Sequence, residues 1–270
     1  MAGDDLIHDP DGGMPRLLEI MRRLRDPVTG CPWDLAQDFA TIAPYTIEEA
    51  HEVEDAIARR AWDELPGELG DLLFQAVFQA QIAADKGMFG FDDVVRAIAD
   101  KMVARHPHVF GTESREKSAE QQTADWERIK AAERGDARVL DGVAPGLPAL
   151  TRAVKLQKRA ARVGFDWPST DQVLAKLVEE AAELVEARDS LTQAEVAEEF
   201  GDLLFVMANL ARHLKVDPEG ALRGANAKFT RRFGRIEDWL AGAGRSPAQS
   251  DLAEMDALWN RAKAEERGKV

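Results

Sequence analysis

Apolar residues recur at spacings of three and four along most of the chain, which is the pattern of amphipathic α-helices. The alternation of apolar and polar residues that marks a β-strand is sparse. We therefore expect an all-α protein. The expected helices cover residues 14–25, 46–60, 63–86, 92–105, 118–133, 149–162, 170–188, 193–214, 218–241 and 250–267.

Several expected helices begin with residues that helix N-termini favour. Thr46 precedes an acidic first turn, and Ser169 or Thr170 precedes the helix that contains Glu179. Pro218 fits the first turn of the helix that follows it. These residues support the helix boundaries that the periodicity indicates.

The helical period is lost between residues 136 and 148, where glycine and proline concentrate. A chain of 270 residues is also long for one domain and is sufficient for two cores. We expect a flexible N-terminus at 1–13, a domain at 14–135, a linker at 136–148 and a second domain at 149–270.

The two halves of the chain repeat one acidic pattern at a displacement of 131 residues. An EExxE motif and a later ExxD motif occur at the same spacing in each half, and the pentapeptide GDLLF at 70–74 returns unchanged at 201–205. We interpret this as the duplication of one functional unit. The repeated acids are Glu48, Glu49, Glu52, Glu68 and Asp71 in the first half and Glu179, Glu180, Glu183, Glu199 and Asp202 in the second.

The spacing of these acids predicts a metal site. Residues three apart share a helix face, so two such helices packed antiparallel would bring four carboxylates together. Four carboxylates repel one another unless a cation lies between them, and oxygen ligands suit a hard ion. We expect Mg²⁺, with Mn²⁺ as a substitute. A single ExxE is common on solvated helices, but Glu199 falls at the margin of an apolar arc, where an unpaired carboxylate is costly.

Cations and tryptophans follow the acids in each half. Lys101 and Arg105 form an i,i+4 pair that Lys228 and Arg232 match. A Trp-x-x-x-Lys pair also occurs in each half, at Trp126 with Lys130 and at Trp259 with Lys263. This order suits a metal cluster, a polyphosphate and a stacked base. We interpret the other tryptophans, Trp167 among them, as packing residues.

Composition narrows the function further. The net charge of -14 argues against a nucleic-acid polymer as partner, because such proteins present a basic face. No apolar run approaches the length of a membrane span, and the acidic N-terminus lacks the features of a secretory signal, so we expect a cytoplasmic protein. The single cysteine, Cys31, excludes an intramolecular disulfide and is consistent with that compartment.

The motifs together resemble the MazG family of nucleoside triphosphate pyrophosphohydrolases, in its bacterial two-domain form. The resemblance extends over essentially the whole chain after residue 13. It rests on the acidic motifs and on GCPWD at 30–34, TIAPYTIEEAHEV at 41–53, GELGDLLFQ at 67–75, RHPHVFG at 105–111, DWERIKAAER at 125–134 and KFTRRF at 228–233. It implies tandem helical bundles, an intertwined homodimer, and Mg²⁺-dependent hydrolysis of nucleoside triphosphates to monophosphate and pyrophosphate.

The resemblance also implies roles for individual residues. Glu179 would lie beside the nucleotide and is a candidate general base, together with the carboxylates of the quartet. The C-terminal unit is the better supported catalytic one, although the first unit keeps its whole quartet. The implied metal ligands are Glu180, Glu183, Glu199 and Asp202 in the second domain and Glu49, Glu52, Glu68 and Asp71 in the first. The implied substrate-binding residues are Lys176, Lys228, Arg231, Arg232, Trp259 and Lys263, with Lys130 in the first half.

Two other functions remain open at the level of sequence. A di-iron carboxylate bundle also uses inward-pointing glutamates, but its Glu-x-x-His pairs do not accompany the quartet. A non-catalytic, dimeric helical regulator with solvated acids is the second alternative. Base and sugar preference depend on the shape of a pocket, which these motifs do not specify.

Overall fold

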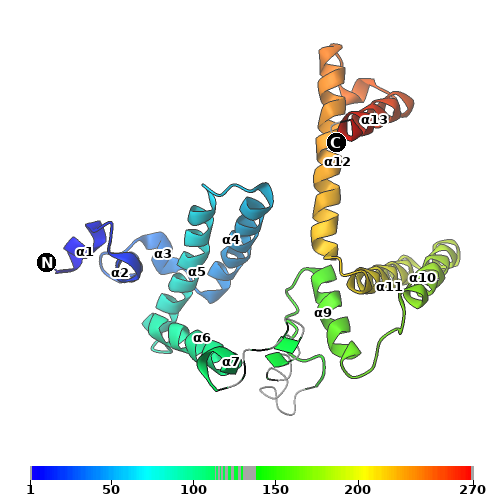
Figure 1. Cartoon of the computed structure of the whole chain (residues 1–270). Coiled ribbons are helices and arrows are strands. Elements are labelled where there is room, and N and C mark those ends of the chain that lie inside the picture. Colours follow the sequence, from blue (N-terminus) through cyan, green and yellow to red (C-terminus); the bar gives the residue numbers. More distant parts are fainter. Residues whose placement is uncertain are drawn as a thin grey trace. The chain divides into compact units, whose positions relative to one another are not determined.

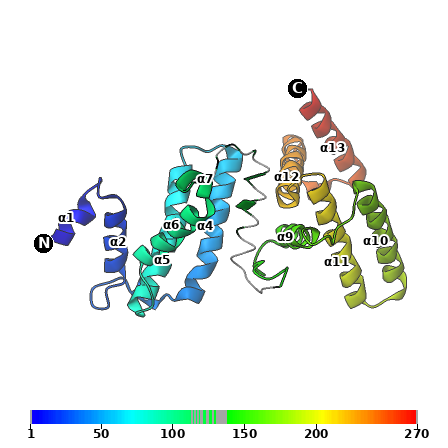
Figure 2. The same ribbon diagram turned by 60° about the horizontal axis from the view of Figure 1, so that its bottom comes forward.

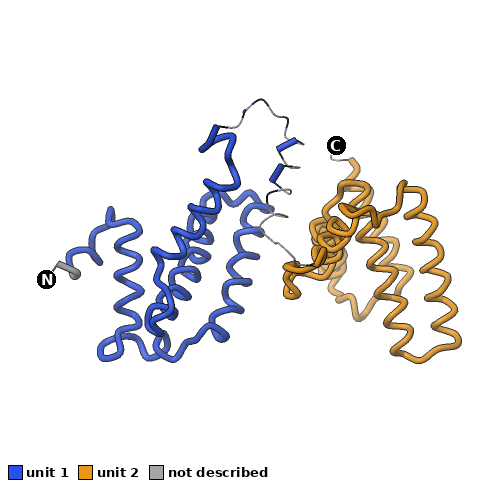
Figure 3. Tube along the Cα trace, turned by 90° about the horizontal axis from the view of Figure 1, so that it is seen from below, with its two compact units in different colours: residues 1–135 blue, residues 136–270 orange. Residues whose placement is uncertain are grey.

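The computed structural model describes residues 2–112, 114, 116, 118, 121, 122, 125, 126, 129 and 138–268. Every regular element within these residues is a helix, so the all-α prediction is confirmed. The chain divides into two compact units, residues 1–135 and 136–270 (Figure 3). Among the described residues, no helix is long and apolar enough to cross a membrane.

The first unit is built around a hairpin of two long helices. The hairpin helices α4 and α5 lie side by side, α2 packs on α5, and α6 follows at its end (Figure 1). The buried core contains Met21, Ile42, Val77, Phe78 and Ile82. The helices are α1 (Ala2–His8), α2 (Gly13–Leu24), α3 (Pro32–Ala36), α4 (Phe39–Arg59), α5 (Leu65–Asp85), α6 (Phe91–Arg105) and α7 (Pro107–Phe110).

The second unit repeats the hairpin. Helices α10 and α11 lie side by side (Figure 2), α9 packs on α11, and α13 packs against the long helix α12. Val173, Ala187, Val206 and Ala208 are buried along the hairpin. The helices are α9 (Ala149–Ala161), α10 (Thr170–Ser190), α11 (Gln193–His213), α12 (Pro218–Gly242), the 3₁₀ turn η1 (Pro247–Gln249) and α13 (Leu252–Arg267).

The helix starts confirm two of the expected boundaries and correct a third. Ser169 caps α10, and Pro218 opens α12 directly after the Asp217 cap. Thr46 is not a cap, because α4 begins seven residues earlier, at Phe39. Asp38 accepts hydrogen bonds from the backbone N–H groups of residues 40 and 41, and the Asp38 N–H donates to Thr41 Oγ1, so the two residues form a capping box. The helix continues through a proline at 44.

The segments outside the long helices differ in part from the expectation. The N-terminal stretch expected to be flexible contains α1, and Arg16 Nε donates a hydrogen bond to the carbonyl oxygen of Ile7 at 2.8 Å. The part of the expected linker that the structure describes contacts α9. The Arg159 guanidinium donates hydrogen bonds to the carbonyl oxygens of Asp141 and Gly142. The expected helix at 118–133 lies largely outside the described residues, and Lys130 lies outside them entirely.

Candidate active site

Three carboxylates of the second unit meet between the two hairpin helices. Glu180 comes from α10, and Glu199 and Asp202 come from successive turns of α11. Each of them offers an oxygen, and these oxygens all lie within 4.8 Å of one another. Glu180 is only 5% exposed, Glu199 is half-buried and Asp202 is exposed. We call these three residues the C-terminal acid cluster.

Glu183, the fourth expected ligand, is exposed and lies outside this close group. It still acts on the cluster through its charge. Burial raises the pKa of Glu199 above its ordinary value, and the neighbouring charges of Glu183, Asp202 and Glu180 raise it further. A cation would relieve this repulsion, so the oxygen-only donor set fits a hard divalent ion.

Lys176 provides a positive charge next to the C-terminal acid cluster. Its Nζ lies 2.8 Å from Glu180 Oε1 and 2.9 Å from Glu179 Oε1, one turn further along α10. These hydrogen bonds, first to Glu180 and then to Glu179, raise the pKa of the Lys176 ammonium. Lys176 therefore contacts both Glu180 of the cluster and Glu179, and their position beside a nucleotide stays a prediction.

The first unit has a matching group, formed by Glu49 on α4 with Glu68 and Asp71 on α5. We call these three residues the N-terminal acid cluster; their carboxylate oxygens also lie within 4.8 Å of one another. Burial raises the pKa of Glu49, and the charges of Glu52 and Asp71 raise it further. Glu52 is exposed and lies outside the close group, as Glu183 does in the second unit.

The expected phosphate-binding cations of α12 have other partners. Arg231 and Arg232 both bind Glu266 on α13, at 2.8 and 2.7 Å, and these hydrogen bonds lower the pKa of Glu266. The Arg232 guanidinium also lies over the Trp259 ring, 5.4 Å from its centroid. Lys228 is exposed.

The remaining expected substrate residues of the second unit thus lie on α12 and α13, and Lys263 among them is half-buried. The ion pairs of Arg231 and Arg232 with Glu266 involve α13 and not the acids of α10 and α11. Within the described second unit, the structure groups the site residues as two sets, one acidic and one cationic.

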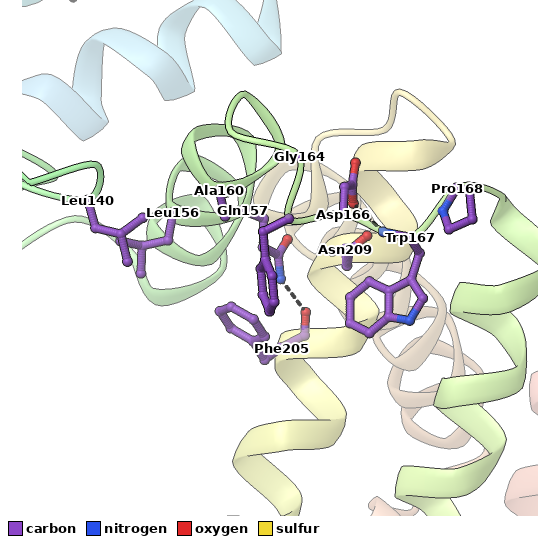
Figure 4. Close-up of a pocket in the computed structure, with 11 residues that line it drawn as sticks. Leu140, Leu156, Gln157, Ala160, Gly164, Asp166, Trp167, Pro168, Phe205 and Asn209 are labelled. Carbon is purple, nitrogen blue, oxygen red and sulfur yellow. Dashed lines mark hydrogen bonds between the residues drawn. The ribbon is translucent and has the colours of Figure 1, made fainter.

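A cavity of about 520 Å³ opens beside the hairpin of the second unit. Figure 4 shows Trp167, Phe205 and Gln157 around it, from the α9–α10 loop, α11 and α9. Gln157 is buried; its Nε2 donates to the Phe205 carbonyl at 2.8 Å, and its Oε1 has no hydrogen-bond partner among the described residues. The buried Asn209 also lines this cavity.

In the first unit, a buried phenylalanine occupies the hairpin position that is equivalent to Asn209. Phe78 lies 131 residues before Asn209 and is 1% exposed. Its ring packs edge-on against Trp33 and Phe74, with centroids 6.4 and 6.0 Å apart. Apolar packing therefore replaces, in the first unit, the polar side chain that faces the cavity in the second.

The sequence motifs identified the acids and Lys176 but not the residues of the cavity. Trp167 was interpreted as a packing residue, yet it lines the opening. Asn209 is a single polar residue in an apolar stretch and Gln157 lies among lysines and arginines, and only the comparison of Asn209 with Phe78 carries a signal. The cavity forms where α9, the α9–α10 loop and α11 meet, so no single sequence motif contains its residues.

The chain was compared with known proteins. Residues 37–110 and 169–235 both match the MazG nucleotide pyrophosphohydrolase domain. A protein of Escherichia coli strain K12 named nucleoside triphosphate pyrophosphohydrolase is 52% identical over 256 residues, which cover 93% of this chain and 97% of that protein. The "Nucleoside triphosphate pyrophosphohydrolase/pyrophosphatase MazG" of Thermotoga maritima is 43% identical, over 92% of this chain and 94% of its own.

A third relative, the nucleoside triphosphate pyrophosphohydrolase of Mycolicibacterium smegmatis, is 31% identical over 95% of this chain and 71% of its own. These similarities extend across both units, and each matched domain region contains one hairpin with its acid cluster. The chain therefore belongs to the MazG nucleotide pyrophosphohydrolase family and carries the family's domain twice.

Proposed function

We propose that the protein hydrolyses nucleoside triphosphates to the monophosphate and pyrophosphate, with Mg²⁺ as its metal and Mn²⁺ as a substitute. The observation that carries this proposal is the C-terminal acid cluster with Lys176 at 2.8 Å from Glu180. The names of the relatives at 52% and 43% identity support the substrate class. Both acid clusters consist of carboxylates alone, which disfavours a di-iron centre.

The proposed ligands in the second unit are Glu180, Glu199 and Asp202, with Glu183 joining from the next turn of α10. Mg²⁺ bound there would neutralise charge on the phosphates and lower the pKa of a bound water. Glu179, exposed beside Lys176, or another carboxylate of the cluster accepts the proton of the attacking water. Water attacks the α-phosphorus, and pyrophosphate leaves without a covalent enzyme intermediate.

The cations of α12 complete the site in this proposal. Lys228, Arg231 and Arg232 stabilise the charge that develops on the leaving pyrophosphate. Trp259 and Lys263 on α13 close over the nucleotide. Because Arg231 and Arg232 bind Glu266 in the structure, phosphate binding requires them to exchange this carboxylate for phosphate oxygens.

We assign catalysis to the second unit on two differences between the hairpins. The position of Lys176 is occupied in the first unit by Tyr45, which offers no ammonium. Asn209 lines the cavity, and its position is occupied in the first unit by the buried Phe78. The second unit therefore has both a cation next to its acids and a space of about 520 Å³ that suits a nucleoside.

We further propose a homodimer. The outer faces of both hairpins expose large apolar side chains at equivalent positions, which a partner helix would bury. A second chain would also provide a route for cations of α12 to approach an acid cluster. The equivalent exposed pairs are Ile47 and Val178, Leu69 and Phe200, and Leu73 and Leu204.

Product analysis tests the proposed reaction. The protein is incubated with a panel of nucleoside triphosphates in H₂¹⁸O, with and without Mg²⁺, and the products are separated. We expect equal amounts of monophosphate and pyrophosphate, with the label in the monophosphate, only when the metal is added. Release of orthophosphate, or no turnover of any triphosphate, would contradict the proposal and favour a non-catalytic regulator.

A further inference from the structure

A second hollow in the second unit, of about 490 Å³, is lined largely by cationic side chains. Its walls are α9, the last turn of α11 and the segment that joins α11 to α12. We call it the basic pocket. Because the whole chain has a net charge of -14, the pocket is a local reversal of that charge. Its cations are Lys155 and Lys158 on α9, Arg212 on α11, and Lys215 shortly after α11.

The three lysines of the basic pocket have no carboxylate partner. They are exposed, and within the described part of the chain their side chains form no ion pair or hydrogen bond. By contrast, Lys176 and Arg232 each bind a glutamate. Lys155 and Lys158 lie three residues apart and so share one face of α9. Positive charges that are grouped in this way attract an anion into the space between them.

The carboxylates near the basic pocket bind backbone groups instead. Asp217 lines the pocket and accepts hydrogen bonds from the N–H groups of Glu219 and Gly220, in the first turn of α12. Glu219 accepts hydrogen bonds from the N–H groups of Leu150 and Thr151, at the start of α9. Both acids therefore cap helix N-termini. They lower the positive potential of the pocket but leave its ammonium groups available to a ligand.

The backbone conformation of Lys215 is one that lysine rarely adopts. Its φ of 57° lies in the left-handed region, which glycine enters without strain. The turn ends α11, and the Val216 N–H donates to the Ala211 carbonyl at 2.8 Å. In the first unit, α5 ends in a turn of the same kind, and the left-handed residue there is Gly87, with a φ of 67°. The cost of a lysine in this turn indicates that its charge has a use beyond ending the helix.

Arg212 connects the basic pocket with the cavity of the second unit. Its side chain is 13% exposed, and its Nε is buried without a hydrogen-bond partner among the described residues. Its Nη2 donates to Asp166 and, at 3.1 Å, to Asn209 Oδ1, and both of these residues line the cavity (Figure 4). A ligand that binds this guanidinium therefore acts on two residues of the cavity.

We propose that the basic pocket binds an anion with adjacent phosphate groups, of the class of inorganic pyrophosphate, at a site separate from the acid clusters and from Lys228, Arg231 and Arg232. Phosphate oxygens form charge-assisted hydrogen bonds with ammonium and guanidinium groups. Cations from three segments suit an anion of several charges. The bound anion also draws Arg212 away from Asp166 and so weakens nucleotide binding in the cavity. This last step rests on the proposed function, whereas the binding does not.

Calorimetric titration of the full chain with pyrophosphate, in a chelator and at constant ionic strength, tests the binding without turnover. We expect the double variant Lys155→Gln with Lys158→Gln to weaken binding by about tenfold or more, because it removes two charge-assisted contacts with phosphate. Arg188→Gln with Arg245→Gln is the matched control. It removes the same charge from two other positions of the second unit and should leave the affinity unchanged.

Lys215→Gly separates binding from folding. It installs the residue that the first unit has in this turn, so the variant should melt no lower than the parent protein. Its affinity for pyrophosphate should nevertheless fall. A parallel titration with a nucleoside diphosphate distinguishes a free polyphosphate from the phosphate tail of a nucleotide. Either ligand supports the proposal if both the lysine pair and Lys215→Gly weaken its binding.

Three results overturn the inference and leave the proposed hydrolysis intact. They are the absence of binding by both ligands, an affinity that the lysine pair or Lys215→Gly leaves unchanged, and binding that Lys228→Gln removes instead. The effect on the cavity is tested by turnover. Added pyrophosphate should raise KM for a triphosphate more in the parent protein than in the lysine-pair variant, and an equal rise in both overturns that step.

Discussion

Lys176 lies one turn before Glu180 on α10, and its ammonium is 2.8 Å from the buried carboxylate. The Glu180 side chain is 7% exposed and the Lys176 side chain 29% exposed, so the contact is partly shielded from water. It is the clearest difference between two hairpins that share their acids position by position.

Replacing Lys176 by methionine should weaken both stability and turnover. Glu180 would lose the partner of a buried charge, so the metal-free protein should unfold more easily by about 1–3 kcal/mol. Added Mg²⁺ should restore most of that loss, because it supplies the missing charge. Thermal melts with and without metal measure this, and kcat/KM for a triphosphate should fall by about 10²-fold. Tyr45→Phe is the matched control, and a similar loss there would refute the assignment.

The part of the stability that Glu199 contributes in the metal-free protein should fall as the pH rises above the ordinary carboxyl value. The pKa of Glu199 is raised above 4.5 by burial and by nearby acids, so between 4.5 and that raised value the folded state binds more protons than the unfolded state. The contribution of Glu199 to the free energy of unfolding therefore decreases as the pH rises through this window, and the difference between the parent protein and Glu199→Gln isolates it. Urea midpoints measure the trend.

Mg²⁺ should reverse this fall, because it favours the ionised carboxylates. Glu199→Gln should remove part of the pH dependence, and Glu49→Gln should remove another part, since the pKa of Glu49 is raised in the same way. A Glu199→Gln variant whose stability depends on pH in the same way as that of the parent protein would contradict the account.

Filling the cavity should impair nucleotide binding without affecting the metal. Asn209→Phe copies the side chain that Phe78 provides in the first unit. We expect KM for the triphosphate to rise severalfold, with Mn²⁺ affinity unchanged, because the cavity and not the acids is altered. Steady-state kinetics and a metal titration measure the two effects, and a melt shows whether the variant folds. An unchanged KM in a folded variant would exclude this cavity from the substrate site.

The ion pairs of α13 should compete with the substrate. Glu266 binds both Arg231 and Arg232, so Glu266→Gln should free the two guanidinium groups for phosphate and lower KM. Arg232→Ala should raise KM, because it removes one of them. A higher KM for Glu266→Gln would show instead that the carboxylate orients the arginines for substrate.

Three acids of each quartet and most helix positions could be predicted from sequence, because both depend on local spacing, whereas Glu52 and Glu183 lie outside the close groups. Residues three apart share a face in any helix, so the ExxE and ExxD motifs fixed which acids could meet. The start of α4 could not be predicted in the same way. The expected start was residue 46, whereas the Asp38 capping box stabilises a helix that begins at Phe39.

Other parts of the site depend on contacts between distant segments. The burial of Gln75 and its contact with Glu49 require α4 and α5 to pack in one register, although the change from Gln75 to Val206 right after a repeated pentapeptide was visible. The ion pairs of Arg232 with Glu266 depend on α13 folding back along α12. Helix periodicity carries no information on that return, so the contact of Arg232 with Glu266 could not be predicted from it.

The most direct measurement of the central claim compares one substitution at the two equivalent positions of the repeat. Asp202→Asn and Asp71→Asn remove the same acid from the two clusters, and pyrophosphate release from a nucleoside triphosphate with Mg²⁺ is measured for each. We predict that Asp202→Asn abolishes most of the release, whereas Asp71→Asn retains most of it. Loss of pyrophosphate release in Asp71→Asn with activity kept in Asp202→Asn would place catalysis in the first unit and contradict the account.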